Sequence, residues 1–404
     1  MTRVKRAAAR AEAVIVGALR TPVGRRNGAL SEIHPVDLLA VPLAAIVGST
    51  GVDPATIDDH LAGCVSQVAE QSLNVGRSAW LAAGLPETVP STTIDRQCAS
   101  SQQAVAFASQ GIQAGAYDLV VASGVEHMTI VPIYSSTVDK QAFSDRLIGR
   151  YHGRLVRQGI SADLIAERWG ISREEQDDFA YRSHVRAAEA IRSGVFDEEI
   201  VPVQTPGGLF TTDECVRMEP DRERMGALES PFRDEEAERL FPGQLGWTIT
   251  AGNASPISDG ASALMLASAA RAEELGMLPL ARVVATVAIG VDPVMMLTGP
   301  IPATRMLFER TGLTLADVDL VEINEAFASV VLAWKREFEI DDGWFDAHVN
   351  IYGGAIAVGH ALGSTGARLM TTLIHALRRR GGRFGLQVMC AQGGVAMASL
   401  VESL

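Results

Sequence analysis

Short apolar runs alternate with amphipathic stretches along much of the chain. Residues 13–18 (AVIVGA) predict a buried strand, and a loop rich in glycine, proline and asparagine follows it. Residues 34–50 carry apolar side chains at helical spacing and predict a helix with a proline in its early turns. The chain therefore opens with a strand, a loop and a helix.

Residues 92–124 contain the clearest unit of mixed structure. Residues 92–95 (TTID) end a predicted strand, residues 98–116 predict a helix of small side chains, and residues 117–124 predict another strand. A strand, a tight turn, a helix and a strand form a βαβ unit, whose strands are normally parallel.

The middle of the chain, roughly residues 127–255, is richer in charged residues and looks like an insertion. Residues 172–194 predict a long amphipathic helix, because Ser172 can cap its start and Glu175 follows three residues later. From residue 280 onward strands and helices alternate again, and residues 385–402 predict a hairpin.

A weak internal repeat relates the two ends of the chain. Residues 100–124 and 364–391 each contain a helix of small residues followed by a strand. Duplicated units of this kind place equivalent loops face to face, which predicts a cleft between two halves.

Composition supports a layered α/β protein. The chain has 404 residues, with 47% hydrophobic and 5% aromatic residues and 38 glycines, so we expect two or three subdomains of closely packed helices and sheets. The net charge of −13 argues against nucleic acid as a partner.

The cysteines and the apolar stretches bear on the cell compartment. The four cysteines are far apart and lack zinc-site spacing, which favours a reducing compartment and no metal site. The first ten residues are basic but lack the apolar core of a secretory signal. Residues 38–48, the longest uncharged apolar stretch, are too few to cross a membrane. We expect a cytoplasmic protein with no membrane partner.

Four stretches combine reactive residues with the end of a predicted strand, where α/β folds place their sites. They contain Cys98, Asn324, His360 and Cys390. Cys98 starts a predicted helix, whose unpaired N–H groups favour the thiolate, and a nucleophilic thiolate needs an imidazole nearby. His360 lies in a glycine-rich loop that can project its ring from a tight turn.

Each of these residues also has a structural alternative, which the sequence leaves open. Cys98 and Cys390 could be small buried apolar side chains, His360 a core histidine, and Asn324 only a helix cap. We interpret the remaining candidates as structural: Cys64, Cys215, His127, His152 and His184. The glycine-rich loop around His360 matches neither a dinucleotide-binding nor a P-loop motif.

Taken together, these stretches resemble the thiolase family of acetyl-CoA acyltransferases. The similarity covers nearly the whole chain and includes RTPVGRRNG, TAGNASPISDGASALML, VEINEAFA and GGAIAVGHALGSTGARL. The resemblance implies a duplicated five-layered αβαβα core with an inserted loop domain. Its N-terminal half would span residues 1–127 and 256–280, the loop domain 128–255, and the C-terminal half 281–404.

The resemblance also implies roles for the reactive residues. Cys98 would be the nucleophile that takes the acyl group, His360 would remove its proton, and Cys390 would be the general acid and base. Asn324 would hold a water that forms an oxyanion hole with His360. The backbone N–H groups of Cys98 and Gln392 would form a second hole.

Further residues and partners follow from the same resemblance. Ser255 and the neighbouring Ala254 would contact the pantetheine arm of coenzyme A, and Gln158 would line the acyl chain. Coenzyme A would be a substrate, with no bound cofactor and no metal. The partners would be acyl-CoA and CoA, and the assembly a homodimer or homotetramer.

Three positions depart from the family pattern. Gln392 replaces a glycine, which predicts strain if its φ is positive. Ala361 replaces the proline after the histidine and would loosen that loop. Gln158 replaces a methionine and places a polar group at the acyl site.

Residues 70–104 resemble most closely the actinobacterial thiolases of sterol side-chain breakdown. We therefore expect thiolytic cleavage of 3-ketoacyl-CoA to acetyl-CoA and a shortened acyl-CoA, on bulky or steroid-derived chains, by a reversible Claisen reaction. A short-chain acetoacetyl-CoA thiolase is the alternative. A thiolase-like lipid-binding protein without catalysis is a second, minor alternative.

Overall fold

The computed structural model describes residues 11–404. The first ten residues, whose basic sequence contributed to the predicted compartment, lie outside this range. A sheet of ten strands forms the framework. Its strands are β1 (Ala13–Arg20), β2 (Gly24–Arg25), β3 (Asp59–Gly63), β4 (Ser91–Ile94), β5 (Leu119–His127), β8 (Ser258–Ser268), β9 (Ala281–Gly290), β10 (Leu320–Ile323), β11 (Phe384–Ala391) and β12 (Val395–Ser403).

The sheet consists of two parts joined by one short contact. The strand order is β10-β11-β12-β9-β1-β8-β5-β3-β4, with β2 paired to β8. At the junction, β1 and β9 pair only through Val14 with Arg282 and Ile15 with Ala281. Helices α3 (Ser100–Ala114) and α14 (Leu362–Arg380) pack against strands of both parts, so they lie between them.

Three separate apolar layers accompany the two parts of the sheet. Helices α1 (Pro35–Thr50) and α2 (Val75–Ala82) cover one outer face, where Leu43 and Trp80 are buried. The central layer contains Ile112 of α3 and Leu373 of α14. Helices α10 (Pro300–Thr311) and α11 (Ala328–Glu337) cover the other outer face, with Trp334 in its core. The predicted five-layered αβαβα core is confirmed.

The βαβ unit differs in one respect from its prediction. Strands β4 and β5 are parallel as expected, but β3 lies between them and pairs in parallel with both. Helix α3 begins at Ser100 and ends at Ala114, so Cys98 precedes the helix rather than starting it.

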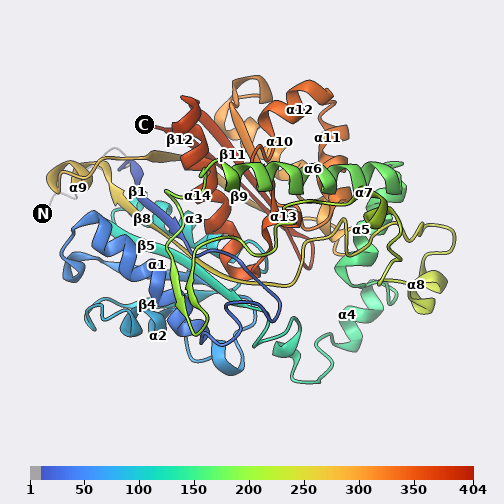
Figure 1. Ribbon diagram of the computed structural model, residues 1–404, viewed down its shortest axis with the longest axis horizontal. Coiled ribbons are helices and arrows are strands. Elements are labelled where there is room, and N and C mark those ends of the chain that lie inside the picture. The colour runs from blue at the N-terminus through green and yellow to red at the C-terminus, as the bar shows by residue number, and fades with distance from the viewer. Residues whose placement is uncertain (1–10) are drawn as a thin grey trace, which may run out of the picture.

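Residues 128–255 form helices of 5 to 20 residues and a two-stranded sheet beside the core. They contain α4 (Asp145–Arg150), α5 (Gln158–Arg168), α6 (Arg173–Arg192), α7 (Arg222–Gly226), α8 (Glu235–Leu240), β6 (Val203–Thr205) and β7 (Gly208–Phe210). The predicted long helix is α6, and Ser172 and Glu175 form its capping box. In Figure 1 α6 crosses the middle of the view, and α4, α5 and α8 lie on the right.

Buried ion pairs fasten this segment to the core. The guanidinium group of Arg20, at the end of β1, contacts Glu199 at 2.6 Å and Asp213 at 2.7 Å, and all three side chains are buried. Because a buried charge needs a partner, losing one member would leave the others uncompensated.

The C-terminal elements complete the layers. They include α9 (Ala269–Glu274), α12 (Asp342–His348) and α13 (Ala355–Val358). Strands β11 and β12 form the predicted antiparallel hairpin. Helix α14 ends at Gly381, which is left-handed, after three arginines in its last turn. Within residues 11–404, no helix is both long and apolar enough to cross a membrane.

Candidate active site

The structure brings the four reactive residues together. Asn324 directly follows β10, Cys390 lies near the end of β11, and His360 precedes α14. The Asn324 amide nitrogen Nδ2 lies 3.5 Å from His360 Nε2, and the Asn324 side chain also hydrogen-bonds to the Cys390 thiol. The Cys98 and Cys390 sulfurs lie within electrostatic range of each other. The expected meeting of strand-end loops therefore takes place.

His360 is held as a neutral base. The Thr365 hydroxyl donates to the Ala361 carbonyl at 2.8 Å, so its oxygen accepts a hydrogen bond from His360 Nδ1–H at 2.7 Å. Nε2 is left with its lone pair on the side of Asn324. Burial, together with the positive charge of Arg368, lowers the pKa of His360 to about 3. The ring is therefore unprotonated at neutral pH.

Cys98 is a neutral thiol at rest, contrary to the sequence-based interpretation. Its side chain is only 2% exposed, and burial raises its pKa to about 12. Hydrogen bonds from the Gln158 amide and from the N–H groups of Cys98 and Gln392 favour the thiolate, but desolvation outweighs them. Helix α3 begins two residues later, so Cys98 lies outside its first turn. A base must therefore deprotonate this sulfur.

Burial and the neighbouring Cys98 also raise the pKa of Cys390 well above its ordinary value.

The turn after Cys390 uses Gly393 and Gly394, whose φ values are 80° and 78°. Gln392 is not among the residues with positive φ, so the strain that a positive φ would cause there does not arise. The φ of Ala361 is −70°, which is within the range that a proline would impose. Ala361 is also buried, so the loop keeps the proline-like conformation without a proline.

Two adjoining cavities lead away from the reactive thiol. The first has a volume of about 490 Å³, and its lining includes Cys98, Gln158 and Gln392. The second, of about 350 Å³, is mainly apolar. The two share Gln392, Phe143, Leu155 and Val156.

The predicted pantetheine residues lie beside the asparagine loop. The Ser255 N–H donates to the Ala326 carbonyl at 3.0 Å, and Ala254 pairs with Phe327. Neither residue lines the two cavities.

Two family models cover almost the whole chain. The thiolase N-terminal domain matches residues 13–270, and the thiolase C-terminal domain matches residues 277–403. The chain belongs to the thiolase family.

Relatives support this membership over their full length. A steroid 3-ketoacyl-CoA thiolase of Mycobacterium tuberculosis is 46% identical, over 99% of this chain and 96% of its own. A 3-oxoadipyl-CoA/3-oxo-5,6-dehydrosuberyl-CoA thiolase of Escherichia coli is 43% identical, over 97% of this chain and 99% of its own. The crystal structure of the Bacillus anthracis acetyl-CoA acetyltransferase has a TM-score of 0.86 and 37% identity, and the match covers 98% of this chain and 100% of that one.

Sequence reasoning missed two residues that organise this thiolase site. Thr365 orients His360. In the sequence, only its position five residues after His360 could have indicated this role. Glu126 is fully buried and accepts hydrogen bonds from the N–H groups of Val65, Ser66 and Gly363, each within 3.0 Å. In the sequence, the signal for Glu126 was an acidic residue near the end of an otherwise largely apolar predicted strand.

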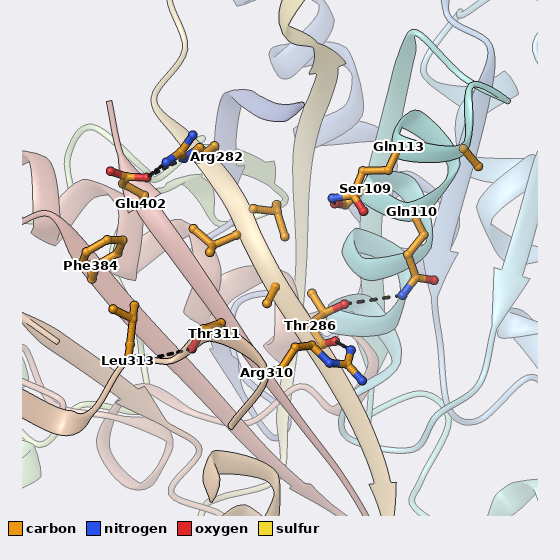
Figure 2. A pocket seen from close by; sticks show the side chains of 14 residues that line it. Ser109, Gln110, Gln113, Arg282, Thr286, Arg310, Thr311, Leu313, Phe384 and Glu402 are labelled. Carbon is orange, nitrogen blue, oxygen red and sulfur yellow. Dashed lines mark hydrogen bonds and ion pairs between the residues drawn. The ribbon is translucent and has the colours of Figure 1, made fainter. Parts of the chain in front are cut away.

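Another cavity of the described residues lies away from the reactive residues. It has a volume of about 680 Å³ and lies between α3, β9 and the end of α10. Figure 2 shows Gln110 of α3 reaching toward Thr286 of β9, beside Arg310. No cysteine or histidine lines it. Among residues 11–404, no group of three or more histidine, cysteine, aspartate or glutamate side chains is placed to hold a metal ion.

Proposed function

We propose that this protein cleaves 3-ketoacyl-CoA with coenzyme A, giving acetyl-CoA and a shortened acyl-CoA. The observation that carries the proposal is the meeting of Cys98, Cys390, Asn324 and His360, of which Cys98 lines a cavity of about 490 Å³. The relatives, which are thiolases and an acetyltransferase, support the same reaction class.

The first half-reaction forms an acyl-enzyme. His360 Nε2 takes the proton of the Cys98 thiol, and the thiolate attacks the C3 carbonyl carbon of the substrate. The bond between C2 and C3 then breaks, and its electron pair passes to C2 as the enolate of acetyl-CoA. Cys390 protonates C2, so acetyl-CoA leaves and Cys98 carries the shortened acyl group as a thioester.

The second half-reaction regenerates the enzyme. The thiol of an incoming coenzyme A gives its proton to the Cys390 thiolate, and the resulting CoA thiolate attacks the acyl-enzyme carbonyl. The Cys98 thiolate leaves and recovers its proton from the His360 imidazolium. Both cysteines and the histidine return to their resting states.

Two sets of donors stabilise the oxygen anions in this scheme. The protonated His360 Nε2 and a water on Asn324 face the thioester oxygen, and buried Asn324 Oδ1 has no hydrogen-bond partner among the described residues, so it can accept from that water. The N–H groups of Cys98 and Gln392, which already point to the Cys98 sulfur, receive the oxygen of the acyl group. Ser255 and Ala254 contact pantetheine.

The acyl chain is proposed to be bulky or branched. The apolar cavity of about 350 Å³ adjoins the Cys98 cavity, which gives a large acyl group a place to extend. The steroid 3-ketoacyl-CoA thiolase relative is consistent with this substrate class. We also propose that the protein is a cytoplasmic homo-oligomer without a bound cofactor. Its N-terminal half would comprise residues 1–127 and 256–280, its C-terminal half residues 281–404, and its inserted loop domain residues 128–255.

A panel of 3-ketoacyl-CoA substrates tests the proposal. The wild type should cleave bulky or branched chains at least as well as acetoacetyl-CoA. Gln158→Met should shift kcat/KM toward acetoacetyl-CoA by roughly 10-fold, within the ~1–3 kcal/mol that pocket shape contributes. Exclusive use of acetoacetyl-CoA, unchanged in the variant, would support the short-chain alternative. No turnover and no acyl group on Cys98 would support the lipid-binding alternative.

A further inference from the structure

Ser258 joins two segments that meet at the active site. It is the first residue of β8 and is fully buried. Its hydroxyl donates a hydrogen bond to the Pro256 carbonyl at 2.9 Å, and its oxygen accepts one from the backbone N–H of His360 at 3.1 Å. Because a hydroxyl has a single proton, donation to Pro256 leaves the lone pairs of the oxygen for His360. Among residues 11–404, this oxygen is the only acceptor of the His360 N–H.

The position of this hydroxyl is fixed by the sheet. Ser258 pairs with Arg25 of β2, and the rest of β8 pairs with β1 and β5. A side chain on a strand inside a sheet is held more precisely than one on a loop. Ser258 therefore gives the loop that carries His360 a rigid point of attachment.

The backbone before His360 fits closely against this serine. Gly359 has a φ of 111°, a conformation that favours glycine. A Cβ atom at residue 359 would lie 2.7 Å from Ser258 Oγ, which leaves no room for a side chain. The peptide group between residues 359 and 360 is therefore seated directly on Ser258, while the ring of His360 is held separately by Thr365.

The same segment also contacts the loop of Asn324. The Ser255 N–H donates to the Ala326 carbonyl at 3.0 Å, two residues after Asn324. Residues 255–258, which include a proline with a restricted backbone, thus contact the asparagine loop at one end and the His360 loop at the other. Their length and stiffness set the separation of the two loops, whose side-chain nitrogens Asn324 Nδ2 and His360 Nε2 lie 3.5 Å apart.

We infer that Ser258 is a positioning residue of the reaction, whose hydroxyl holds His360 in line with Asn324 so that both face the same oxygen atom of the substrate. The inference rests on the proposed function, in which His360 Nε2 and a water on Asn324 stabilise the thioester oxygen. Ser258 does not line the cavity of the Cys98 thiol, so it acts through His360. A displacement of about 1 Å at such a site can lower a rate by as much as ~100-fold.

Ser258→Ala tests the inference. The variant removes the acceptor of the His360 N–H and should lower kcat for 3-ketoacyl-CoA cleavage by roughly 10-fold, while KM for 3-ketoacyl-CoA and for coenzyme A changes by less than ~2-fold. Ser258→Thr retains the hydroxyl and should recover most of the activity.

Ser268→Ala is the matched control. Ser268 is buried at the other end of β8, and its oxygen also accepts a backbone N–H, that of Arg271 at 3.2 Å. Loss of this hydrogen bond should lower the free energy of unfolding in urea, as it should in Ser258→Ala, but kcat should stay at the wild-type value.

The outcomes separate this inference from the proposed function. A wild-type kcat in Ser258→Ala, or equal losses of kcat in Ser258→Ala and Ser268→Ala, would overturn the inference alone. A higher KM for coenzyme A with an unchanged kcat would assign Ser258 to the pantetheine contact and also overturn it. Even if Ser258→Ala does not fold, a roughly 10-fold loss of kcat in Ser258→Thr, which keeps the hydroxyl, would contradict the inference. Absence of cleavage of every 3-ketoacyl-CoA by the wild type would instead overturn the proposed function.

Discussion

The Thr365 hydroxyl fixes which nitrogen of His360 carries the proton. Its oxygen lies 2.7 Å from His360 Nδ1 while its hydrogen is committed to the Ala361 carbonyl, 2.8 Å away. The ring therefore presents an unprotonated Nε2 toward Asn324. A single hydroxyl, one turn into α14, thus determines whether the imidazole can act as a base.

Thr365→Val tests this arrangement. The variant removes the acceptor for Nδ1–H, so kcat should fall by roughly 10-fold, a part of the ~10²–10⁴-fold that a positioned base contributes. Thr371→Val is the matched control, because Thr371 makes the same hydrogen bond to a carbonyl four residues earlier, at 2.9 Å, on the same helix. Equal losses in both variants would indicate a structural effect on α14 only.

Replacement of the nucleophile should abolish acylation. In Cys98→Ala, mass spectrometry should find no acyl group on the protein, whereas Cys215→Ser should acylate normally. Cys98 lines the cavity, so limiting iodoacetamide should modify it before Cys64, which is fully buried. Because burial raises the Cys98 pKa to about 12, the rate should increase steadily above pH 7. Earlier modification of Cys64 or Cys215 would contradict the assignment.

Cys390→Ser should separate the two parts of the reaction. Transfer of an acetyl group from acetyl-CoA to Cys98 needs Cys390 only to protonate the departing CoA thiolate, which is a good leaving group, and not to remove an α-proton, so it should be slowed much less than carbon–carbon bond chemistry. Carbon–carbon bond formation and cleavage should fall by at least ~100-fold, the lower end of general acid–base contributions. Condensation of acetyl-CoA at the wild-type rate would show that Cys390 is only a buried packing residue without a catalytic role.

The buried His60 should make the protein sensitive to acid. Its Nε2 lies 2.7 Å from Ser123 Oγ and its Nδ1 2.9 Å from Ser91 Oγ, and burial lowers its pKa to about 3. Between pH 6.5 and pH 3 the unfolded chain binds a proton that the native state does not, so stability falls as the pH falls. His60→Gln should remove up to about 2 kcal/mol of the loss between pH 7 and pH 5. Urea unfolding at both pH values measures it, and parallel curves would contradict the prediction.

An exposed sheet edge predicts self-association. Strand β4 is the last strand in its part of the sheet, and the neighbouring Leu73 is 91% exposed. Asn74 connects this leucine to the edge through a 2.9 Å hydrogen bond to the Ser91 carbonyl. A second copy could pair along β4. Leu73→Asp should raise the dimer Kd by at least ~10-fold in sedimentation, because burying a leucine contributes about 1.5–3 kcal/mol.

The control for self-association is Leu278→Asp, since Leu278 is 83% exposed but lies away from β4. A wild type that sediments as a stable monomer at micromolar concentration would contradict the prediction.

Local signals predicted much of the architecture. Ser172 and Glu175 fixed the start of α6, and the apolar residues around Cys390 indicated its hairpin. The position of β3 between β4 and β5 could not be predicted, because strand order depends on packing across the sheet and not on spacing. The internal repeat did indicate that loops of two halves would meet.

The site was predictable in its residue types but less so in its electrostatics. The strand-end positions of Cys98 and Cys390 indicated where reactive thiols would lie, yet their protonation depends on burial, which the sequence does not quantify. The roles of Thr365 and Glu126 depend on contacts with residues distant in the fold.

The hydrogen bonds of Glu126 have a consequence for biosynthesis. Its carboxylate is shared between the N–H groups of residues 65 and 66 and that of Gly363, which lies 237 residues later in the chain. A nascent chain that has reached residue 300 already contains Glu126 and its early donors, but the donor beside the histidine does not yet exist. The loop that carries His360 can therefore be held in place by Glu126 only when translation is nearly complete. A product truncated before this loop contains Cys98 but lacks the histidine that deprotonates it.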